Sequence, residues 1–150
     1  MGIFLEHDAL KKLNIGIISS RFNEEVVSEL FEACIANLQV AGVNINNIKH
    51  ETVPGALEIP VMLDCFARSN KFDVLIGIGA VIRGETYHFE VVSDQSAYGL
   101  LQVQLNYHIP IINAIITTNS NEEAFARTKI KGEEAAQAAI EMAGLVKKYE

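Results

Sequence analysis

One histidine of the sequence directly follows a glycine-rich segment. Residues 79–86, Gly-Ala-Val-Ile-Arg-Gly-Glu-Thr, fit the frame of a nucleotide-binding phosphate loop, except that Glu85 replaces the lysine. A carboxylate there would repel a triphosphate, which excludes a nucleoside triphosphatase, but backbone N–H groups and the Thr86 hydroxyl could hold a single phosphate. Because a histidine titrates near neutral pH, we predict that His88 is a general acid or base. Alternatively, the glycine-rich segment is only a tight turn after a strand, and His88 is a structural histidine.

The same histidine belongs to a His-x-Glu pattern, His88-Phe89-Glu90, that zinc deaminases also contain. The Pro-Cys-x-x-Cys segment that completes the zinc site is missing, and the two cysteines stand far apart, so we predict no metal site. Cys34 and Cys65 lie in apolar stretches, and the N-terminus lacks the layout of a signal peptide. These features predict reduced thiols and a cytoplasmic protein.

Three further segments could contribute to a binding site. Phe22 either packs as a hydrophobic staple or offers an aromatic face to a flat heterocycle. Residues 53–60, Val-Pro-Gly-Ala-Leu-Glu-Ile-Pro, form a turn in which Glu58 either complements a helix dipole or accepts hydrogen bonds from ligand hydroxyls. Arg127 and Lys131 are either a solvated cluster or the counter-charge of a phosphate, for which an arginine fork is well suited.

Short β-branched segments alternate with longer amphipathic ones along the chain. We expect strands over residues 13–19, 48–53, 74–82 and 109–117. We expect helices over residues 23–40, with Asn23 as N-cap, and over 57–68, 93–107, 121–127 and 132–149. This alternation predicts right-handed βαβ units and a parallel sheet with helices on both faces. Ligands bind such sheets at the carboxyl ends of the strands, where the candidate segments lie.

The composition predicts one domain over residues 1–150, with residues 1–12 as an N-terminal arm. A net charge of -7 argues against a protein that binds nucleic acid or an anionic membrane surface. The chain is 49% hydrophobic, yet no apolar run approaches the roughly 18 residues of a membrane span. Residues 84–126 contain no Lys or Arg, and the helix 93–107 is apolar around most of its circumference. It is therefore either central to the monomer or part of a subunit interface.

Residues 20–23 (Ser-Arg-Phe-Asn), 53–60, 79–88 and 131–136 (Lys-Gly-Glu-Glu-Ala-Ala) together resemble the lumazine synthase family, in the same order and at nearly the same spacing. The resemblance implies a flavodoxin-like three-layer sandwich with strand order 2-1-3-4. It also implies a transferase of riboflavin biosynthesis that joins 5-amino-6-(D-ribitylamino)uracil to 3,4-dihydroxy-2-butanone 4-phosphate. The products would be 6,7-dimethyl-8-ribityllumazine, phosphate and water, and no metal or redox cofactor is expected.

The resemblance also implies binding roles for individual residues. Phe22 would stack on the pyrimidine ring. The residues that would bind the ribityl chain and the ring edge are Ala56, Leu57 and Glu58. The residues that would frame the uracil through their backbone are Ala80, Val81 and Ile82.

The reacting groups are assigned by the same resemblance. The Glu85 amide and the Thr86 hydroxyl would hold the phosphate, with Arg127 as its cation. His88 would transfer protons, and we place Arg127 and Lys131 with it in the catalytic group. Asn113 would bind substrate by hydrogen bonds, since it stands where many members carry an aromatic residue from a neighbouring subunit. Residues 127–132 are about four residues shorter than the common form of the family.

The family assembles as homopentamers with active sites between neighbours, sometimes packed further into decamers or sixty-subunit shells. The stretch without cations over residues 84–126 agrees with such an interface. The expected partners are thus two small-molecule substrates and further copies of the chain, with neither nucleic acid nor membrane. Two alternatives stay open: an archaeal-type riboflavin synthase, and a non-catalytic lumazine- or flavin-binding or shell protein.

Overall fold

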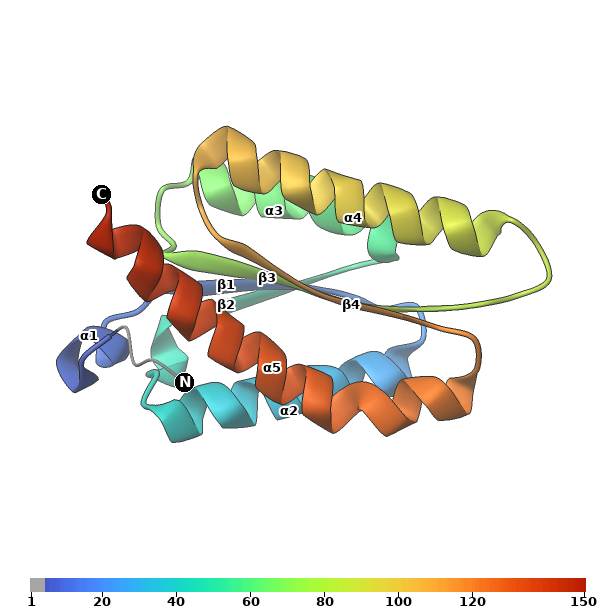
Figure 1. Ribbon diagram of the computed structural model, residues 1–150, viewed down its shortest axis with the longest axis horizontal. Helices are drawn as coiled ribbons and strands as arrows, with labels where there is room; N and C mark the ends of the chain where they lie inside the picture. The colour runs from blue at the N-terminus through green and yellow to red at the C-terminus, as the bar shows by residue number, and fades with distance from the viewer. Residues whose placement is uncertain (1–4) are drawn as a thin grey trace.

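Four parallel strands form the centre of the structure (Figure 1). The computed structural model describes residues 5–150. The strands are β1 (Ile15–Ser20), β2 (Ile48–Val53), β3 (Val74–Ile82) and β4 (Ile111–Thr118). Their order across the sheet is β2-β1-β3-β4, and every neighbouring pair is parallel. The predicted α/β fold and strand order are therefore confirmed, and the bounds of β2 and β3 match the prediction.

Two helical layers enclose the sheet (Figure 1). On one face lie α3 (Ile59–Arg68) and α4 (His88–Tyr107), and on the other lie α2 (Glu24–Ala41) and α5 (Asn121–Lys148). Shorter elements are α1 (His7–Lys11), η1 (Ile45–Asn47) and η2 (Ala56–Glu58). Residues 1–4 of the predicted N-terminal arm lie outside the described residues. Within residues 5–150, no helix has both the length and the apolar character that crossing a membrane requires.

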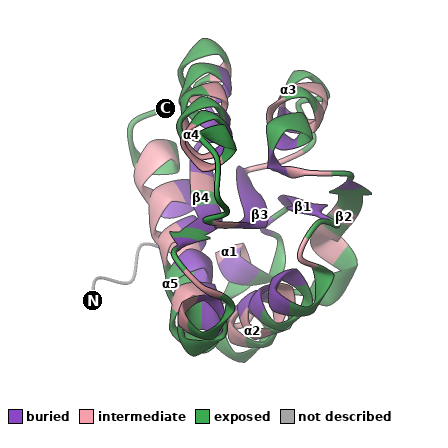
Figure 2. Ribbon diagram, turned by 90° about the vertical axis from the view of Figure 1, so that its right-hand side faces the viewer, coloured by how far each residue is buried: buried purple, intermediate pink, exposed green. Residues whose placement is uncertain are grey.

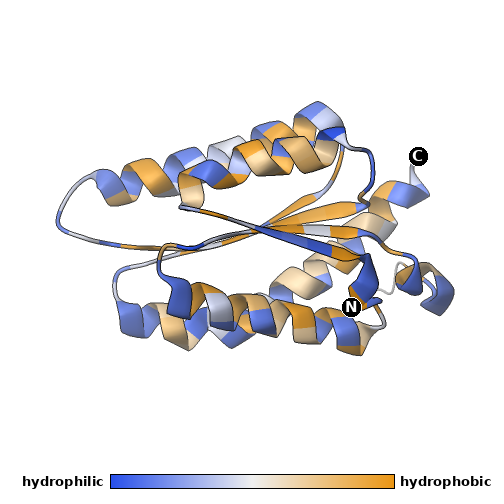
Figure 3. Ribbon diagram, turned by 180° about the vertical axis from the view of Figure 1, so that it is seen from behind, coloured by the Kyte–Doolittle hydropathy of each residue, from blue (hydrophilic) through white to orange (hydrophobic). Residues whose placement is uncertain are grey.

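The apolar residues of the strands separate into two cores, one on each side of the sheet. Every side chain of β1 is buried, as expected for a strand that is covered on both faces. The edge strand β2 is the hydrophilic one (Figure 3), and its residues are mostly exposed or half-buried. On the helices, buried residues face the sheet and exposed residues face outward (Figure 2). Cys34 of α2 is fully buried in one of these cores, and this burial raises the pKa of its thiol to about 12.

Two helix predictions were wrong. Residues 121–148 form one continuous helix, α5, and not two helices separated near residue 130. The polar segment between the predicted helices contains Thr128, which is buried and lies within 3.4 Å of Glu29 of α2, so tertiary packing carries the helix through it. The helix predicted over 93–107 begins five residues earlier, at His88, which places this side chain in the first turn of α4.

The outer face of α4 is not covered by other parts of the described chain. Leu100 and Val103 are buried against the sheet, whereas Tyr98, Leu101 and Leu105 are each more than half exposed. The helix is therefore not central to the monomer. Its role in a subunit interface stays a prediction.

A histidine on the edge strand couples the stability of the fold to pH. His50 Nε2 and Ser19 Oγ share a hydrogen bond of 2.7 Å, and the imidazole stacks on Phe31 with ring centres 4.1 Å apart. Burial lowers the pKa of His50 below 6.5, and the neighbouring Glu51 carboxylate opposes this effect more weakly. The unfolded chain therefore binds a proton more readily than the folded chain, so acidification favours unfolding.

We expect the free energy of unfolding to be highest above the ordinary histidine pKa and to fall as the pH drops from 6.5 to the lowered pKa of His50. The loss should be small, because His50 is only half-buried and solvent weakens the effect. Urea denaturation at pH values between about 5 and 8, roughly the titration range of histidine, would measure this loss of stability. His50→Gln should flatten the profile, and His7→Gln, at an exposed site, should not. An unchanged profile in His50→Gln would assign the effect to another group.

Candidate active site

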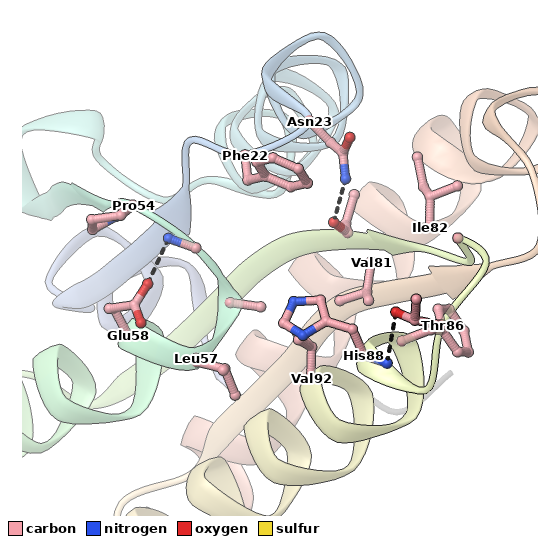
Figure 4. A pocket seen from close by; sticks show the side chains of 15 residues that line it. Phe22, Asn23, Pro54, Leu57, Glu58, Val81, Ile82, Thr86, His88 and Val92 are labelled. Atoms are coloured by element: carbon pink, nitrogen blue, oxygen red, sulfur yellow. Dashed lines mark hydrogen bonds between the residues drawn. The ribbon is translucent and has the colours of Figure 1, made fainter.

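The loops that follow β1, β2 and β3 surround one cavity at the carboxyl ends of these strands (Figure 4). Its volume is about 550 Å³, which is within the usual range for small-molecule sites. Apolar side chains predominate in the lining. The lining residues are Phe22, Asn23, Pro54, Gly55, Ala56, Leu57, Glu58, Ala80, Val81, Ile82, Gly84, Thr86, His88, Phe89 and Val92. Nine of the residues predicted from the sequence thus lie around one space.

The loop between β1 and α2 presents the aromatic side of the cavity. Phe22 is 72% exposed. Its backbone is nevertheless fixed, because its amide donates to the Pro54 carbonyl at 3.1 Å. Asn23 has a left-handed backbone (φ 61°), and its Nδ2 donates to the Ala80 carbonyl at 2.9 Å. Asn23 therefore occupies the predicted N-cap position of α2, but its side chain makes no capping hydrogen bond, because the amide is used to join the β1–α2 loop to β3. The exposed ring, held by two neighbouring strands, supports the heterocycle-binding interpretation over a hydrophobic staple.

The turn after β2 is closed by its own glutamate. Glu58 Oε1 accepts a hydrogen bond from the Gly55 amide at 2.9 Å, and the Glu58 amide donates back to the Gly55 carbonyl at 3.1 Å. This reciprocal pair fixes the direction of the turn. The second carboxylate oxygen, Oε2, has no hydrogen bond within residues 5–150, and both Glu58 and Leu57 are exposed residues that line the cavity. The carboxylate can therefore both hold the turn and accept a hydrogen bond from a ligand hydroxyl.

The end of β3 and the start of α4 form the opposite side. Ala80, Val81 and Ile82 line the cavity with the last residues of the strand. Thr86 Oγ1 accepts the His88 amide at 3.3 Å, which leaves the hydroxyl hydrogen free to donate. The exposed His88 side chain points toward the cavity (Figure 4). A hydroxyl donor and an imidazole thus both line this side of the cavity.

Four predicted residues do not line this cavity. Glu85 is exposed in the loop before α4. Asn113 lies on β4, where its Oδ1 accepts the Ile115 amide at 2.9 Å. Arg127 Nη1 donates to the Glu123 carbonyl at 3.1 Å, and Lys131 Nζ lies 3.8 Å from a Glu134 carboxylate oxygen. The described chain therefore gathers the predicted heterocycle side of the site but not its predicted cations.

Sequence reasoning missed several lining residues. Phe89 and Val92 belong to the first turns of α4, and a helix start at His88 would have placed Val92 one turn beyond the histidine. Asn23 was interpreted only as a cap, although asparagine is one of the few residues that tolerate a left-handed backbone. No group of three or more His, Cys, Asp or Glu side chains among residues 5–150 is arranged to hold a metal ion.

Four features meet at the carboxyl edge of the parallel sheet: an aromatic face, a closed turn with a carboxylate, strand-end backbone groups and an imidazole. The fold is that of a flavodoxin-like α/β protein, and the cavity at this edge has the size and position of a small-molecule site. Residues 12–147 match the sequence model of the 6,7-dimethyl-8-ribityllumazine synthase family. The chain therefore belongs to the lumazine synthase family, as its motifs predict.

Individual relatives agree with this result. A 6,7-dimethyl-8-ribityllumazine synthase of Cupriavidus necator is 52% identical over 134 residues, covering 89% of this chain and 81% of the relative. One of Cupriavidus pinatubonensis is 51% identical over 134 residues, covering 89% and 80%. One of Burkholderia mallei is 51% identical over 141 residues, covering 94% and 80%. Family membership thus extends over nearly the whole chain.

Proposed function

We propose that this protein condenses 5-amino-6-(D-ribitylamino)uracil with 3,4-dihydroxy-2-butanone 4-phosphate to 6,7-dimethyl-8-ribityllumazine, phosphate and water, a step of riboflavin biosynthesis. The observation that carries the proposal is the cavity of about 550 Å³ in which Phe22, the turn of residues 55–58, the end of β3, Thr86 and His88 meet. The match of residues 12–147 to the family model supports it independently.

The pyrimidine substrate fits the side of the cavity nearest Phe22. A flat ring stacks favourably on an exposed aromatic face, and Phe22 offers such a face without having to move. Backbone groups of residues 80–82 would frame the ring edge. The ribityl hydroxyls would reach the turn at Ala56 and Leu57 and the Oε2 of Glu58, which has no hydrogen-bond partner among residues 5–150. This substrate would therefore be held chiefly by groups that are already fixed by hydrogen bonds.

The phosphate substrate fits the side of the cavity nearest the β3–α4 loop. The Thr86 hydroxyl can donate to a phosphate oxygen, and the Glu85 amide lies in the same exposed loop. His88 would move protons while the exocyclic amine forms an imine with the ketone, phosphate leaves, and the ring closes with loss of water. Holding the two substrates side by side would supply much of the remaining rate enhancement.

A homopentamer would bring the remaining predicted groups to the cavity. Arg127, Lys131 and Asn113 lie away from it in the described chain, so a neighbouring copy would have to supply them. The exposed apolar side chains on α4, Tyr98, Leu101 and Leu105, could be covered by such a neighbour. Sedimentation would distinguish a pentamer, a decamer and a larger shell. A cytoplasmic location completes the proposal and rests on the two unpaired cysteines.

The deciding experiment mixes both substrates with the purified protein and follows lumazine absorbance together with released phosphate. Appearance of both products in equal amounts supports the proposal. Conversion of lumazine without a phosphate requirement would favour an archaeal-type riboflavin synthase. Binding of lumazine without turnover would favour a carrier or shell protein. Either of these last two results would overturn the proposed reaction.

We expect Arg127→Ala to raise KM for the butanone phosphate about 10- to 100-fold, the effect of losing a charge-assisted contact to phosphate. KM for the pyrimidine should change little, because Arg127 would contact only the phosphate. Steady-state kinetics with each substrate varied would measure both constants. Lys129→Ala removes an exposed cation of the same helix and serves as the matched control. An unchanged KM for the phosphate substrate in Arg127→Ala would exclude this role.

A further inference from the structure

The segment that carries His88 has few contacts with the sheet. Residues 84–87 between β3 and α4 are all exposed, and a Cβ atom added at Gly84 would meet no atom within 4 Å. The hydrogen bond from the His88 amide to Thr86 Oγ1 lies within the segment and does not attach it to a strand. Apart from the packing of Phe89 and Val92 on the core of this face, the start of α4 therefore has few contacts that hold it beside the cavity.

Arg83, the residue after β3, provides an additional attachment. Its Nη1 donates to both carboxylate oxygens of Glu90 at 3.0 and 3.1 Å, and its Nε donates to Asn119 Oδ1 at 2.9 Å. The guanidinium carbon lies 4.3 Å from the centre of the Phe89 ring. The Arg83 amide donates to the Thr118 carbonyl at 2.9 Å. One side chain thus connects the ends of β3 and β4 to the two residues that directly follow His88.

We propose that Arg83 is a positioning residue for the reaction proposed above, on which this inference rests. By holding Phe89 and Glu90, Arg83 fixes the first turn of α4 and with it the direction in which His88 enters the cavity. Arg83 itself does not line the cavity. Its ion pair with Glu90 is partly exposed, and such pairs add little to global stability. The effect of losing it should therefore be seen in catalysis more than in folding.

Arg83→Met keeps the apolar stem of the side chain and removes the guanidinium. We expect kcat to fall about 10- to 100-fold, as for a catalytic group displaced by about 1 Å, with KM for both substrates nearly unchanged. Because Arg83 acts through His88, Arg83→Met should lower kcat no further in a His88→Ala background. If the double variant loses the product of the two single effects, Arg83 does not act through His88 and the inference is wrong.

Two further variants test the geometry. Arg83→Lys retains the charge but lacks the planar fork that reaches Glu90, Asn119 and Phe89 together, so it should recover only a small part of kcat. Full recovery would show that charge alone suffices and would overturn the proposal. Arg68→Met removes another exposed arginine, ion-paired with Asp64 on α3, and should leave kcat unchanged.

A readout without substrates separates this inference from the proposed reaction. Amide hydrogen exchange over residues 88–92 should be faster in Arg83→Met, and also in Glu90→Gln, which serves if the first variant does not fold. If the wild-type protein makes no lumazine while the variants still exchange faster, the proposed reaction is refuted and the attachment by Arg83 is supported. Unchanged exchange in a folded variant would refute the attachment, whatever the wild-type activity.

Discussion

His88→Ala is expected to lower kcat about 100- to 10 000-fold, the usual contribution of a positioned acid or base, while both KM values change little. The reason is that the groups expected to bind the substrates are separate from the histidine. Phe22 and the turn of residues 55–58 are fixed by backbone hydrogen bonds that do not involve the histidine, so substrate binding should survive its loss. Steady-state kinetics with each substrate varied would measure kcat and KM, and calorimetry with the pyrimidine substrate would measure binding directly.

His108 provides the matched control for this variant. It is an exposed histidine that ends the same helix, and it has a left-handed backbone with φ 51°, which asparagine accepts. His108→Asn should therefore leave kcat unchanged. A normal kcat in His88→Ala would remove the imidazole from proton transfer. A large rise in KM with normal kcat would instead make His88 a binding residue.

The sheet was predictable because its strands have strong local signals. Residues 74–82 form an unbroken apolar run, as buried parallel strands do, and β3 has these bounds in the structure. The continuity of α5 was not predictable in the same way, because its middle is polar in sequence. What keeps Thr128 helical is its burial against α2, and its partner Glu29 lies 99 residues away along the chain. Local periodicity carries no information about such a contact.

The candidate site shows the same division between local and long-range information. The turns at Phe22 and Glu58 and the glycine-rich segment before His88 were recognisable from short motifs, and the parallel sheet brings all three to one edge. The long-range side-chain contacts that hold these segments in place were not recognisable. Asn23 reaches the Ala80 carbonyl 57 residues away, and Arg83 reaches Asn119 36 residues away. Both use side chains whose types fit many other roles.

The net charge of the whole chain does not describe the charge around the cavity. The net charge of -7 still argues against binding of nucleic acid. Glu58 is the only Asp, Glu, Lys or Arg that lines the cavity among residues 5–150, and the turn uses one of its oxygens. A phosphate at the side of the cavity nearest the β3–α4 loop would therefore contact hydroxyl and amide donors and would not face several carboxylates. The acidity of the protein resides elsewhere on the chain and does not prevent binding of an anionic substrate.

Gly132→Ala is expected to destabilise the fold by about 2 kcal/mol, the typical cost of overpacking a close contact. A Cβ atom at this position would lie 2.5 Å from Ala33 Cβ, 2.9 Å from the Cys34 amide nitrogen and 3.0 Å from the Leu30 carbonyl oxygen. Two of these atoms are backbone of α2, so α2 and α5 would have to separate. The better helix propensity of alanine, worth about 1 kcal/mol, offsets only part of this cost. Urea denaturation would measure the difference.

Two comparisons make this prediction specific to the contact between the helices. Gly84→Ala adds the same methyl group where no atom lies within 4 Å, and its effect should stay within about 0.5 kcal/mol. Ala33→Gly removes the nearest clashing atom but leaves the two backbone contacts, so it should restore only part of the stability lost in Gly132→Ala. The double variant should accordingly lose less than the sum of the two single variants. Strict additivity would mean that α2 and α5 do not meet as closely at Gly132 as the structure places them.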